Sequence, residues 1–215
     1  MNDIPGFFSI TEQTEIIKLL SKYNYTDCVG VEVGCWHGRS SIAISIAINK
    51  GTLYCIDKWD GNGSYQQRFI KNHNTIMGVR AEEHNLPDPH SHNTLETFLK
   101  YTESQKNIIP ICGSSPQIVQ DWSKPIDFIF LDASHINPND RDNIDFWLPK
   151  IKPGGTFSGH DFYKNARRRH SLGRSPKDGG CPDVNLNVEY MEDFLKQKVT
   201  IIPNTSIWYF TLPKS

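Results

Sequence analysis

Short apolar runs alternate with helical patterns along most of this sequence, and this alternation restricts the fold more than any other feature. Strands that are separated by a helix pair in parallel through right-handed crossovers, so the pattern predicts an α/β protein. We therefore expect a Rossmann-like open sheet of about seven strands in a three-layer sandwich, with helices on both faces and the last strand antiparallel. The expected strands are 28–34, 52–57, 107–112, 126–132, 156–161, 199–203 and 207–212, and the expected helices are 10–23, 38–50, 116–122, 140–150 and 185–198.

Two segments are longer than an ordinary connection in such a fold. Residues 58–106 contain an expected helix at Tyr65–His73 and then a polar, proline-containing stretch with three histidines, His84, His90 and His92. Residues 162–184 carry the basic cluster 167–177. Both leave the sheet at the carboxyl ends of strands, where open α/β sheets bind ligands. We expect exposed, lid-like segments, and the basic cluster is either a solvated loop or a flap that recognises an anionic or glycosidic acceptor.

Length and charge narrow the classes of protein further. The chain has 215 residues, of which 37% are hydrophobic, and its formal charge is −1. One core fits this length, so we expect a single domain over 1–215, with the N-terminal helix docked on the sheet or on another subunit of a homo-oligomer. The balanced charge argues against nucleic acid and membrane surfaces as partners. The sequence lacks a secretory pattern and Cys-x-x-Cys spacing, which predicts a cytoplasmic protein with reduced thiols.

The stretch from Val31 to Ser41, VEVGCWHGRSS, carries the most information about a ligand. Gly34 ends a buried strand and lets a ligand approach the backbone, and the helix that opens near Gly38 offers free N–H groups to an anion. Asp57 ends the next strand, where an acid accepts hydrogen bonds from a ribose. The spacing lacks the middle glycine that admits a pyrophosphate. A nucleoside without a diphosphate fits better than NAD, and a turn that needs glycines only for packing is the alternative.

These residues resemble the class I S-adenosylmethionine (SAM)-dependent methyltransferases, through Glu32-x-Gly34-x-x-x-Gly38 and Asp57. The resemblance extends to Ile56-Asp-Lys-Trp59, Gly113-Ser-Ser115, the stretch 130–135 (FLDASH) and the stretch 154–161 (GGTFSGHD). It is strongest to the branch of metal-dependent small-molecule and sugar O-methyltransferases that includes macrocin O-methyltransferase and cephalosporin-tailoring enzymes. It implies SAM as cofactor and the hydroxyl group of a small molecule or sugar as acceptor.

The resemblance also implies roles for individual residues. Glu32, Gly34 and Gly38 would line the methionine end of SAM, and Asp57 would hold the ribose hydroxyls. Trp59, Ser114 and Ser115 would lie near the adenine. For Trp59 the alternative is an aromatic that packs under a lid, and for the serines it is an N-cap of the helix at 116–122.

Asp132 and Asp161 follow neighbouring parallel strands, so their carboxylates meet at one rim of the sheet. Unpaired acids at such a rim repel each other, and a divalent cation such as Mg²⁺ or Mn²⁺ removes that repulsion. Without a metal, these acids would cap helices or order loops. The family resemblance implies a metal here that chelates substrate oxygens, with Asp132, His160 and Asp161 as its ligands.

Two histidines lie beside these acids in the sequence. His135 occupies the position of the general base in the resembling family, and a histidine can accept a hydroxyl proton near neutral pH. His160 departs from the family's usual carboxylate or Asn. Either it binds a softer metal than Mg²⁺, or it is a second acid/base group and fewer protein ligands hold the metal. We thus expect Asp132, His135 and His160 to be the catalytic residues.

Two other functions fit the same expected sheet. A nicotinamide-dependent oxidoreductase is disfavoured by the missing glycine and by the lack of a Tyr-x-x-x-Lys pair. A non-catalytic protein that binds SAM is disfavoured by the acids and His135 at the rim. An O-methyltransferase is the function that the sequence favours.

Overall fold

We describe a computed structural model of the chain, which covers residues 4–60, 75–76, 79–80, 94–162 and 181–214. The expected helix at 65–73, the histidines at 84, 90 and 92 and the basic cluster 167–177 lie outside these residues. The main sheet consists of β1 (Val29–Val33), β2 (Thr52–Asp57), β5 (Ile108–Cys112), β6 (Ile126–Leu131), β7 (Ile151–Gly159), β8 (Thr200–Ile201) and β9 (Trp208–Thr211). The helices are α1 (Ile10–Leu20), α2 (Arg39–Ala47), α4 (Leu95–Thr102), α5 (Asn139–Trp147) and α6 (Pro182–Leu195), with 3₁₀ turns at Ser21–Tyr23, Gln117–Val119 and Leu148–Lys150.

The seven strands are ordered β5-β2-β1-β6-β7-β9-β8. The neighbours from β5 to β7 pair in parallel, whereas β9 is antiparallel to both β7 and β8. This confirms the expected Rossmann-like sheet with its antiparallel last strand. β5 lies at the edge of the sheet, where its Pro110, which has no N–H to donate, is tolerated. The order along the chain reverses between β1 and β6, which is where open α/β sheets bind ligands. A separate antiparallel pair, β3 (Thr75–Ile76) with β4 (Val79–Arg80), precedes α4.

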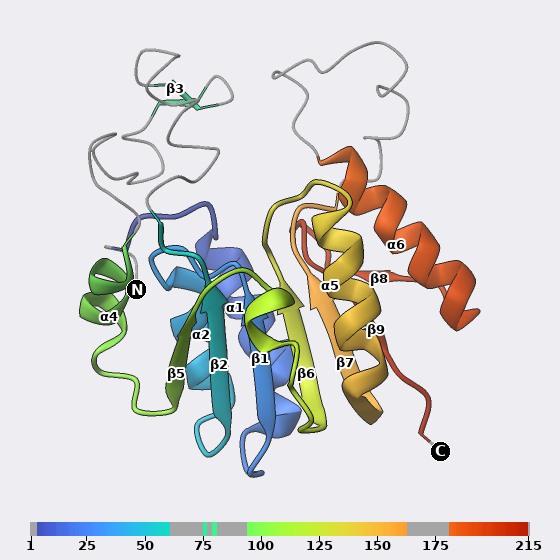
Figure 1. The fold of residues 1–215 in the computed structure, drawn as a ribbon, viewed down its shortest axis with the longest axis horizontal. Helices are drawn as coiled ribbons and strands as arrows, with labels where there is room; N and C mark the ends of the chain where they lie inside the picture. Colours follow the sequence, from blue (N-terminus) through green and yellow to red (C-terminus); the bar gives the residue numbers. More distant parts are fainter. Residues whose placement is uncertain (1–3, 61–74, 77–78, 81–93, 163–180, 215) are drawn as a thin grey trace.

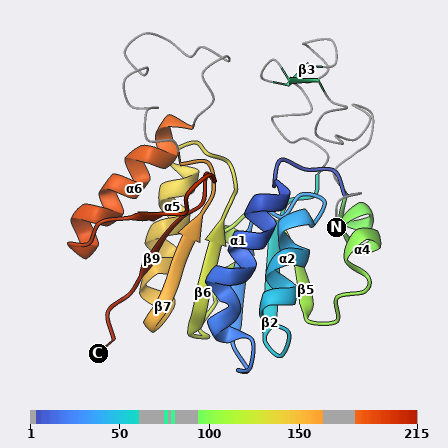
Figure 2. The same ribbon diagram turned by 180° about the vertical axis from the view of Figure 1, so that it is seen from behind.

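Helices cover both faces of the sheet. Figure 1 shows α5 in front of β6 and β7, and Figure 2 shows α1 and α2 on the opposite face. Alternate residues of the central strands enter two cores: Phe128 and Phe130 of β6 pack on the α1–α2 side, and Ile129 and Leu131 pack on the α5 side. Burial on both faces explains why these strands read as nearly continuous apolar runs.

The structure corrects several expected boundaries. β7 begins at Ile151 and not at residue 156, so Gly154 and Gly155 lie inside the strand. The register between β6 and β7 shifts between Ile126 and Phe128, which accommodates the extra residues. The helix expected at 116–122 is only the 3₁₀ turn Gln117–Val119, and α6 begins at Pro182 and not at residue 185. Proline at the first turn of a helix is well tolerated because its missing N–H has no partner there.

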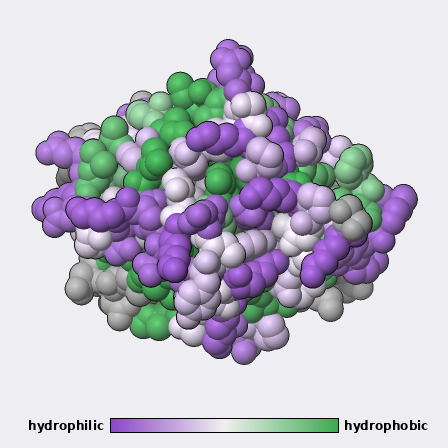
Figure 3. Space-filling model, turned by 90° about the horizontal axis from the view of Figure 1, so that it is seen from below, coloured by the Kyte–Doolittle hydropathy of each residue, from purple (hydrophilic) through white to green (hydrophobic). Residues whose placement is uncertain are grey.

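No helix among the described residues is long and apolar enough to cross a lipid bilayer. The five cysteines form no disulfide with one another. On the face at the amino ends of the parallel strands, hydrophilic and hydrophobic residues are interspersed (Figure 3). The residues expected to act in catalysis lie at the opposite, carboxyl edge of the strands.

Candidate active site

Two glycines shape the loop between β1 and α2. Gly34 and Gly38 have φ values of 88° and 90°, in the left-handed region that disfavours side chains. A Cβ on Gly34 would lie 2.0 Å from the carbonyl oxygen of Asp132, and one on Gly38 would lie 2.6 Å from Cγ2 of Thr102. The loop is therefore pressed against the end of β6 and against α4, and only glycine fits at these two positions.

Asp57 holds this loop in place. Its Oδ2 accepts hydrogen bonds from the backbone N–H groups of Cys35 and Trp36, both at 2.8 Å. Its Oδ1 accepts a longer one, at 3.2 Å, from the N–H of Trp59. Asp57, at the end of β2, thus holds the expected cofactor loop through its backbone N–H groups. Oδ1 accepts fewer hydrogen bonds than Oδ2.

Glu32 lies underneath the same loop and is fully buried. Its carboxylate accepts hydrogen bonds from the Ser40 hydroxyl at 2.5 Å and the Cys55 thiol at 3.5 Å. Burial raises the pKa of Glu32 to about 7, although these donors act in the opposite direction. Glu32 joins β1 to the first turn of α2, so any effect on a cofactor is transmitted through the loop.

The three residues expected near the adenine have different surroundings. Trp59 is 5% exposed, packs on Phe98 with ring centroids 4.6 Å apart, and donates its indole N–H to the Trp36 carbonyl at 2.8 Å. Ser114 is exposed. Ser115 donates its hydroxyl to Asn143 of α5 at 2.6 Å, and it caps no helix. The structure therefore brings Trp59 to the glycine loop and ties Ser115 to α5.

An aromatic stack involves the loop and the N-terminal segment. The ring of Trp36 stacks with Phe7 and with His37, with centroids 5.7 and 4.8 Å apart. His37 is 1% exposed, and neither of its ring nitrogens has a hydrogen-bond partner among the described residues. Burial lowers the pKa of His37 to about 4, so the ring is neutral at physiological pH.

The carboxyl ends of β6 and β7 bring four expected site residues into a closed ring. The Nε2 atom of His135 lies 3.4 Å from Asp132 Oδ1 and 3.3 Å from Asp161 Oδ2. The Nδ1 atom of His160 lies 3.7 Å from Asp132 Oδ2 and 3.5 Å from Asp161 Oδ1. Each aspartate thus directs one oxygen to each histidine. The prediction that these side chains meet at one rim is confirmed.

Two members of this ring have strained backbones. His135 and Asp161 have φ values of 56° and 62°, which residues other than glycine adopt at some cost in energy. Such strain is concentrated at functional sites, where surrounding contacts hold the side chain in place. Here the Ser206 hydroxyl accepts the N–H of Asp161 at 3.3 Å, and the Ser134 hydroxyl donates to Asp140 at 2.8 Å beside His135.

Glu12 of α1 is a member of this site that the sequence reasoning missed. Its Oε1 lies 2.9 Å from His160 Nε2 and also accepts the N–H and the hydroxyl of Ser206, at 3.3 and 3.2 Å. In the sequence, Glu12 shows only as the third residue after Ser9 in a capping box, which is indeed present. No local pattern indicates that the same carboxylate reaches a histidine 148 residues away.

The charges in this site are strongly coupled. Burial alone would lower the pKa of His160, but Asp132, Glu12 and Asp161 outweigh it and raise the pKa to about 9. Burial would likewise raise the pKa of Glu12, but its hydrogen bond to His160 and the histidine's charge lower it to about 2. For Asp132, burial raises the pKa despite the two histidines, and Asp161 adds to the rise.

The donor atoms fit a divalent cation that accepts nitrogen as well as oxygen. One ligand atom each from Asp132, His160 and Asp161 lies within 4.8 Å of the others. A second set, which shares only Asp161 with the first, joins Asp161 to His135 and to the thiol of Cys181. Imidazole and thiolate favour Mn²⁺, Fe²⁺ or Zn²⁺ over Mg²⁺. The residues present therefore fit a metal, and they fit a softer one than the carboxylates alone would.

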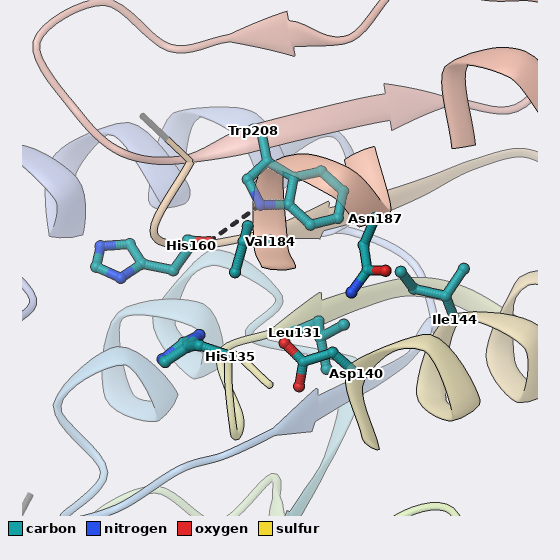
Figure 4. A pocket seen from close by; sticks show the side chains of 8 residues that line it. All are labelled: Leu131, His135, Asp140, Ile144, His160, Val184, Asn187 and Trp208. Carbon is teal, nitrogen blue, oxygen red and sulfur yellow. Dashed lines mark hydrogen bonds between the residues drawn. The ribbon is translucent and has the colours of Figure 1, made fainter. Parts of the chain in front are cut away.

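A cavity of about 10 Å³, near the lower limit for one water molecule, lies on the α5–α6 side of His135. Eight side chains line it: Leu131, His135, Asp140, Ile144, His160, Val184, Asn187 and Trp208 (Figure 4). Trp208 donates its indole N–H to the carbonyl of His160 at 3.1 Å, which fixes the backbone next to the ring. This cavity is too small to hold an acceptor molecule.

Comparison with known structures finds the same fold in several O-methyltransferases. The O-methyltransferase from Bacillus cereus, solved with S-adenosylhomocysteine (SAH), has a TM-score of 0.58 and 13% identity, over 94% of this chain and 81% of that one. TomG from Streptomyces achromogenes, solved with SAM, has a TM-score of 0.59 and 13% identity, over 96% and 81%. The O-methyltransferase NovP has a TM-score of 0.61 and 14% identity, again over 96% and 81%. These similarities show a shared fold.

The family follows from the sequence itself. Residues 31–162, more than half of the chain, match the methyltransferase-domain family. The matched region includes the Gly34–Gly38 loop, Asp57 and the ring of aspartates and histidines, and it excludes α1 with Glu12. The chain thus belongs to the methyltransferase-domain family and is a SAM-dependent methyltransferase of the class I fold.

Proposed function

We propose that this protein transfers the methyl group of SAM to a hydroxyl oxygen of a small molecule or sugar. The observation that carries the proposal is the ring formed by Asp132, His135, His160 and Asp161 next to the glycine loop. Gly34 contacts Asp132 so closely that a methyl donor at the loop and an acceptor at the ring would be neighbours. O-methyltransferases of the same fold support the choice of oxygen as acceptor.

The methyl donor would bind along the loop from Gly34 to Gly38. The two glycines give this loop its left-handed turns, and the start of α2 would present N–H groups to the methionine carboxylate. Asp57 Oδ1 would accept a ribose hydroxyl, since Oδ2 is already engaged by the loop. Trp59 and Ser114 would border the adenine. Glu32 and Ser115 would hold the loops that form the site.

Methyl transfer is a single displacement. The acceptor oxygen forms a bond to the methyl carbon as the carbon–sulfur bond breaks, and SAH leaves with the bonding electron pair. The hydroxyl proton passes to His135, which we assign as the general base. Its Nε2 faces Asp132 and Asp161, so these carboxylates hold the ring and Nδ1 is the nitrogen that accepts the proton. Positioning of donor and acceptor supplies much of the rate.

A divalent metal would be held by Asp132, His160 and Asp161. When bound, such a cation lowers the pKa of a coordinated hydroxyl group and aligns neighbouring substrate oxygens. The second role that the sequence allows for His160, as an acid/base group, is disfavoured because its ring is 5% exposed and both nitrogens face carboxylates. With such a metal, the protein would belong to the metal-dependent branch of O-methyltransferases that accept small molecules and sugars.

The test combines ligand binding with turnover. Thermal-shift titrations with SAH and with NAD should show stabilisation by SAH only. Release of SAH from SAM should then require a hydroxylated acceptor, screened over sugars and catechols with Mn²⁺ or Mg²⁺. Stabilisation by NAD alone would support the nicotinamide-dependent oxidoreductase instead. Tight SAH binding without turnover on any acceptor would support a non-catalytic SAM-binding protein.

A further inference from the structure

The carboxylate of Glu12 has two separate sets of partners. Oε2 accepts the backbone N–H and the hydroxyl of Ser9, at 2.8 and 2.9 Å, and so closes the capping box of α1. Oε1 meets His160 Nε2 at 2.9 Å and accepts both hydrogen bonds of Ser206. Oε2 therefore caps helix α1, and Oε1 contacts the candidate active site. The side chain of Glu12 is 9% exposed, so water does not compete strongly for either oxygen.

The contact with Glu12 determines how His160 presents its ring. A carboxylate only accepts hydrogen bonds, so Nε2 of His160 must carry the proton that joins them. The other nitrogen, Nδ1, then points at Asp132 Oδ2 and Asp161 Oδ1. The aromatic rings of Phe8 and Phe130 lie 5.4 and 6.5 Å from the imidazole centroid and offer no competing polar partner.

We propose that Glu12 is a positioning residue, which keeps Nε2 of His160 protonated and directs Nδ1 into the gap between Asp132 and Asp161. Glu12 touches neither donor nor acceptor, and it acts only through His160. Carboxylates behind a metal-binding histidine orient the ring and increase its basicity, and their loss weakens metal binding. The inference deepens the proposed function and rests on it only where the gap is taken to hold a cation. Helix α1, outside the matched family region, would thereby complete the active site.

The competing explanation is that Glu12 only stabilises the start of α1. Ser9→Ala separates the two, because it removes the Ser9 hydroxyl from Oε2 and leaves the His160 and Ser206 contacts of Oε1 untouched. It is the matched control for helix stability. Glu12→Ala removes both sets of contacts. Glu12→Gln keeps the size and an amide oxygen that can still accept the Nε2 proton, and it is the conservative rescue variant.

The first measurement is proton NMR of protein with ¹⁵N-labelled histidine. A downfield Nε2–H signal, assigned by its absence in His160→Gln, should be present in the wild type, in Ser9→Ala and, shifted, in Glu12→Gln. It should be absent in Glu12→Ala, where exchange with water is fast. Persistence of the signal in Glu12→Ala, or its loss in Ser9→Ala, would overturn the inference. This measurement does not depend on turnover or on metal, so it holds even if the proposed function fails.

The second measurement is Mn²⁺ affinity, followed by electron paramagnetic resonance. Glu12→Ala should weaken Mn²⁺ binding by about 10- to 100-fold, as losses of carboxylates behind ligand histidines do, and Ser9→Ala should leave it unchanged. Glu12→Gln should show a smaller loss in the same direction, and it decides the matter if Glu12→Ala does not fold. Equal losses in Ser9→Ala and Glu12→Ala would assign Glu12 to helix capping alone. A wild type that binds no Mn²⁺ would refute the metal of the proposed function, while the NMR result would still decide the role of Glu12.

Discussion

A Cβ on Gly34 would lie 2.0 Å from the carbonyl oxygen of Asp132, so the loop after β1 and the acid after β6 are in direct contact. The contact lies at the point where the strand order reverses, between β1 and β6. Because this gap has no room for even one more carbon atom, the glycine loop packs directly on the first residue of the ring of aspartates and histidines. This relationship suggests the first of five tests.

Gly34→Ala should impair both stability and SAH binding. The new Cβ meets Asp132, and a left-handed backbone costs a residue other than glycine about 1–3 kcal/mol. We expect a lower melting temperature and a dissociation constant for SAH raised by at least about tenfold, equivalent to ~1.4 kcal/mol. Gly154→Ala is the control, because Gly154 also has positive φ but its Cβ would meet only the side chain of Lys214. If both variants bound SAH like the wild type, the loop would not be the donor site.

His135→Ala should slow methyl transfer without weakening donor binding. Loss of a general base reduces kcat by about 10²–10⁴-fold. The ion-pair contacts of the His135 ring are to Asp132 and Asp161, and they do not include a residue of the loop from Gly34 to Gly38. Single-turnover release of SAH measures the rate, and calorimetry with SAH measures binding. Unchanged turnover in the variant would remove His135 from the mechanism and leave the family assignment intact.

Removal of divalent metal should abolish transfer reversibly. After treatment with EDTA, Mn²⁺ should restore activity better than Mg²⁺, because the donor set includes imidazole. Asp161→Asn should weaken Mn²⁺ binding, measured by electron paramagnetic resonance. Asp145→Asn, at an exposed carboxylate of α5 that accepts the Tyr190 hydroxyl, is the matched control and should have no effect. Full activity in EDTA would place this enzyme among methyltransferases that work without a metal.

His37 should make the protein less stable in mild acid. Its pKa is lowered from 6.5 to about 4 by burial, so between these values the unfolded chain binds a proton that the folded chain does not. The free energy of unfolding should fall with falling pH in this window, by at most about 1.4 kcal/mol per pH unit. In His37→Phe this contribution should vanish, as measured by urea unfolding at pH 5 and pH 8. Parallel pH profiles for the two proteins would contradict the buried, neutral ring.

Glu32 should make the protein less stable as the pH rises from 4.5 to 7, whereas His37 does so as the pH falls. Its pKa is raised from 4.5 to about 7 by burial, so between these values the folded chain holds a proton that the unfolded chain releases. The stabilising contribution is complete below pH 4.5 and is lost as the pH rises through 7. Glu32→Gln, which keeps an acceptor for the Ser40 hydroxyl, should be less sensitive to this rise. The same urea experiments measure it, and a larger pH dependence in the variant would show the sign to be wrong.

Much of the fold could be predicted because its signals are local. Buried parallel strands such as β6 are nearly continuous apolar runs, and a strand pair joined by a short turn with no helix is antiparallel. The expected start of β7 was wrong because Gly154 and Gly155 look like a helix stop, whereas hydrogen bonds with Pro213 and Leu212, which follow β9, hold them in the sheet. Strand pairing is a long-range interaction, and it overrode the local glycine signal.

The candidate site, too, was predictable only where its geometry follows from local signals and topology. Asp132 and Asp161 end neighbouring strands, so their meeting follows from topology alone, and it was predicted. Trp59 and Ser115 were expected beside the adenine from resemblance, yet their depth and partners depend on packing against Phe98 and Asn143. No pattern in the sequence reports such contacts.

The sequence by itself determined where most strands and helices form, where the glycine turn lies, and which acids lie at the carboxyl ends of β2, β6 and β7, because these features follow from hydrophobic period and backbone preference. Only the tertiary structure decided which oxygen of each aspartate faces which histidine, and that Glu12 holds His160 from a helix far away in the chain. The physical reason is that a hydrogen bond needs atoms placed to within a fraction of an ångström. That placement is set by how α1 packs on the sheet, which involves the whole core.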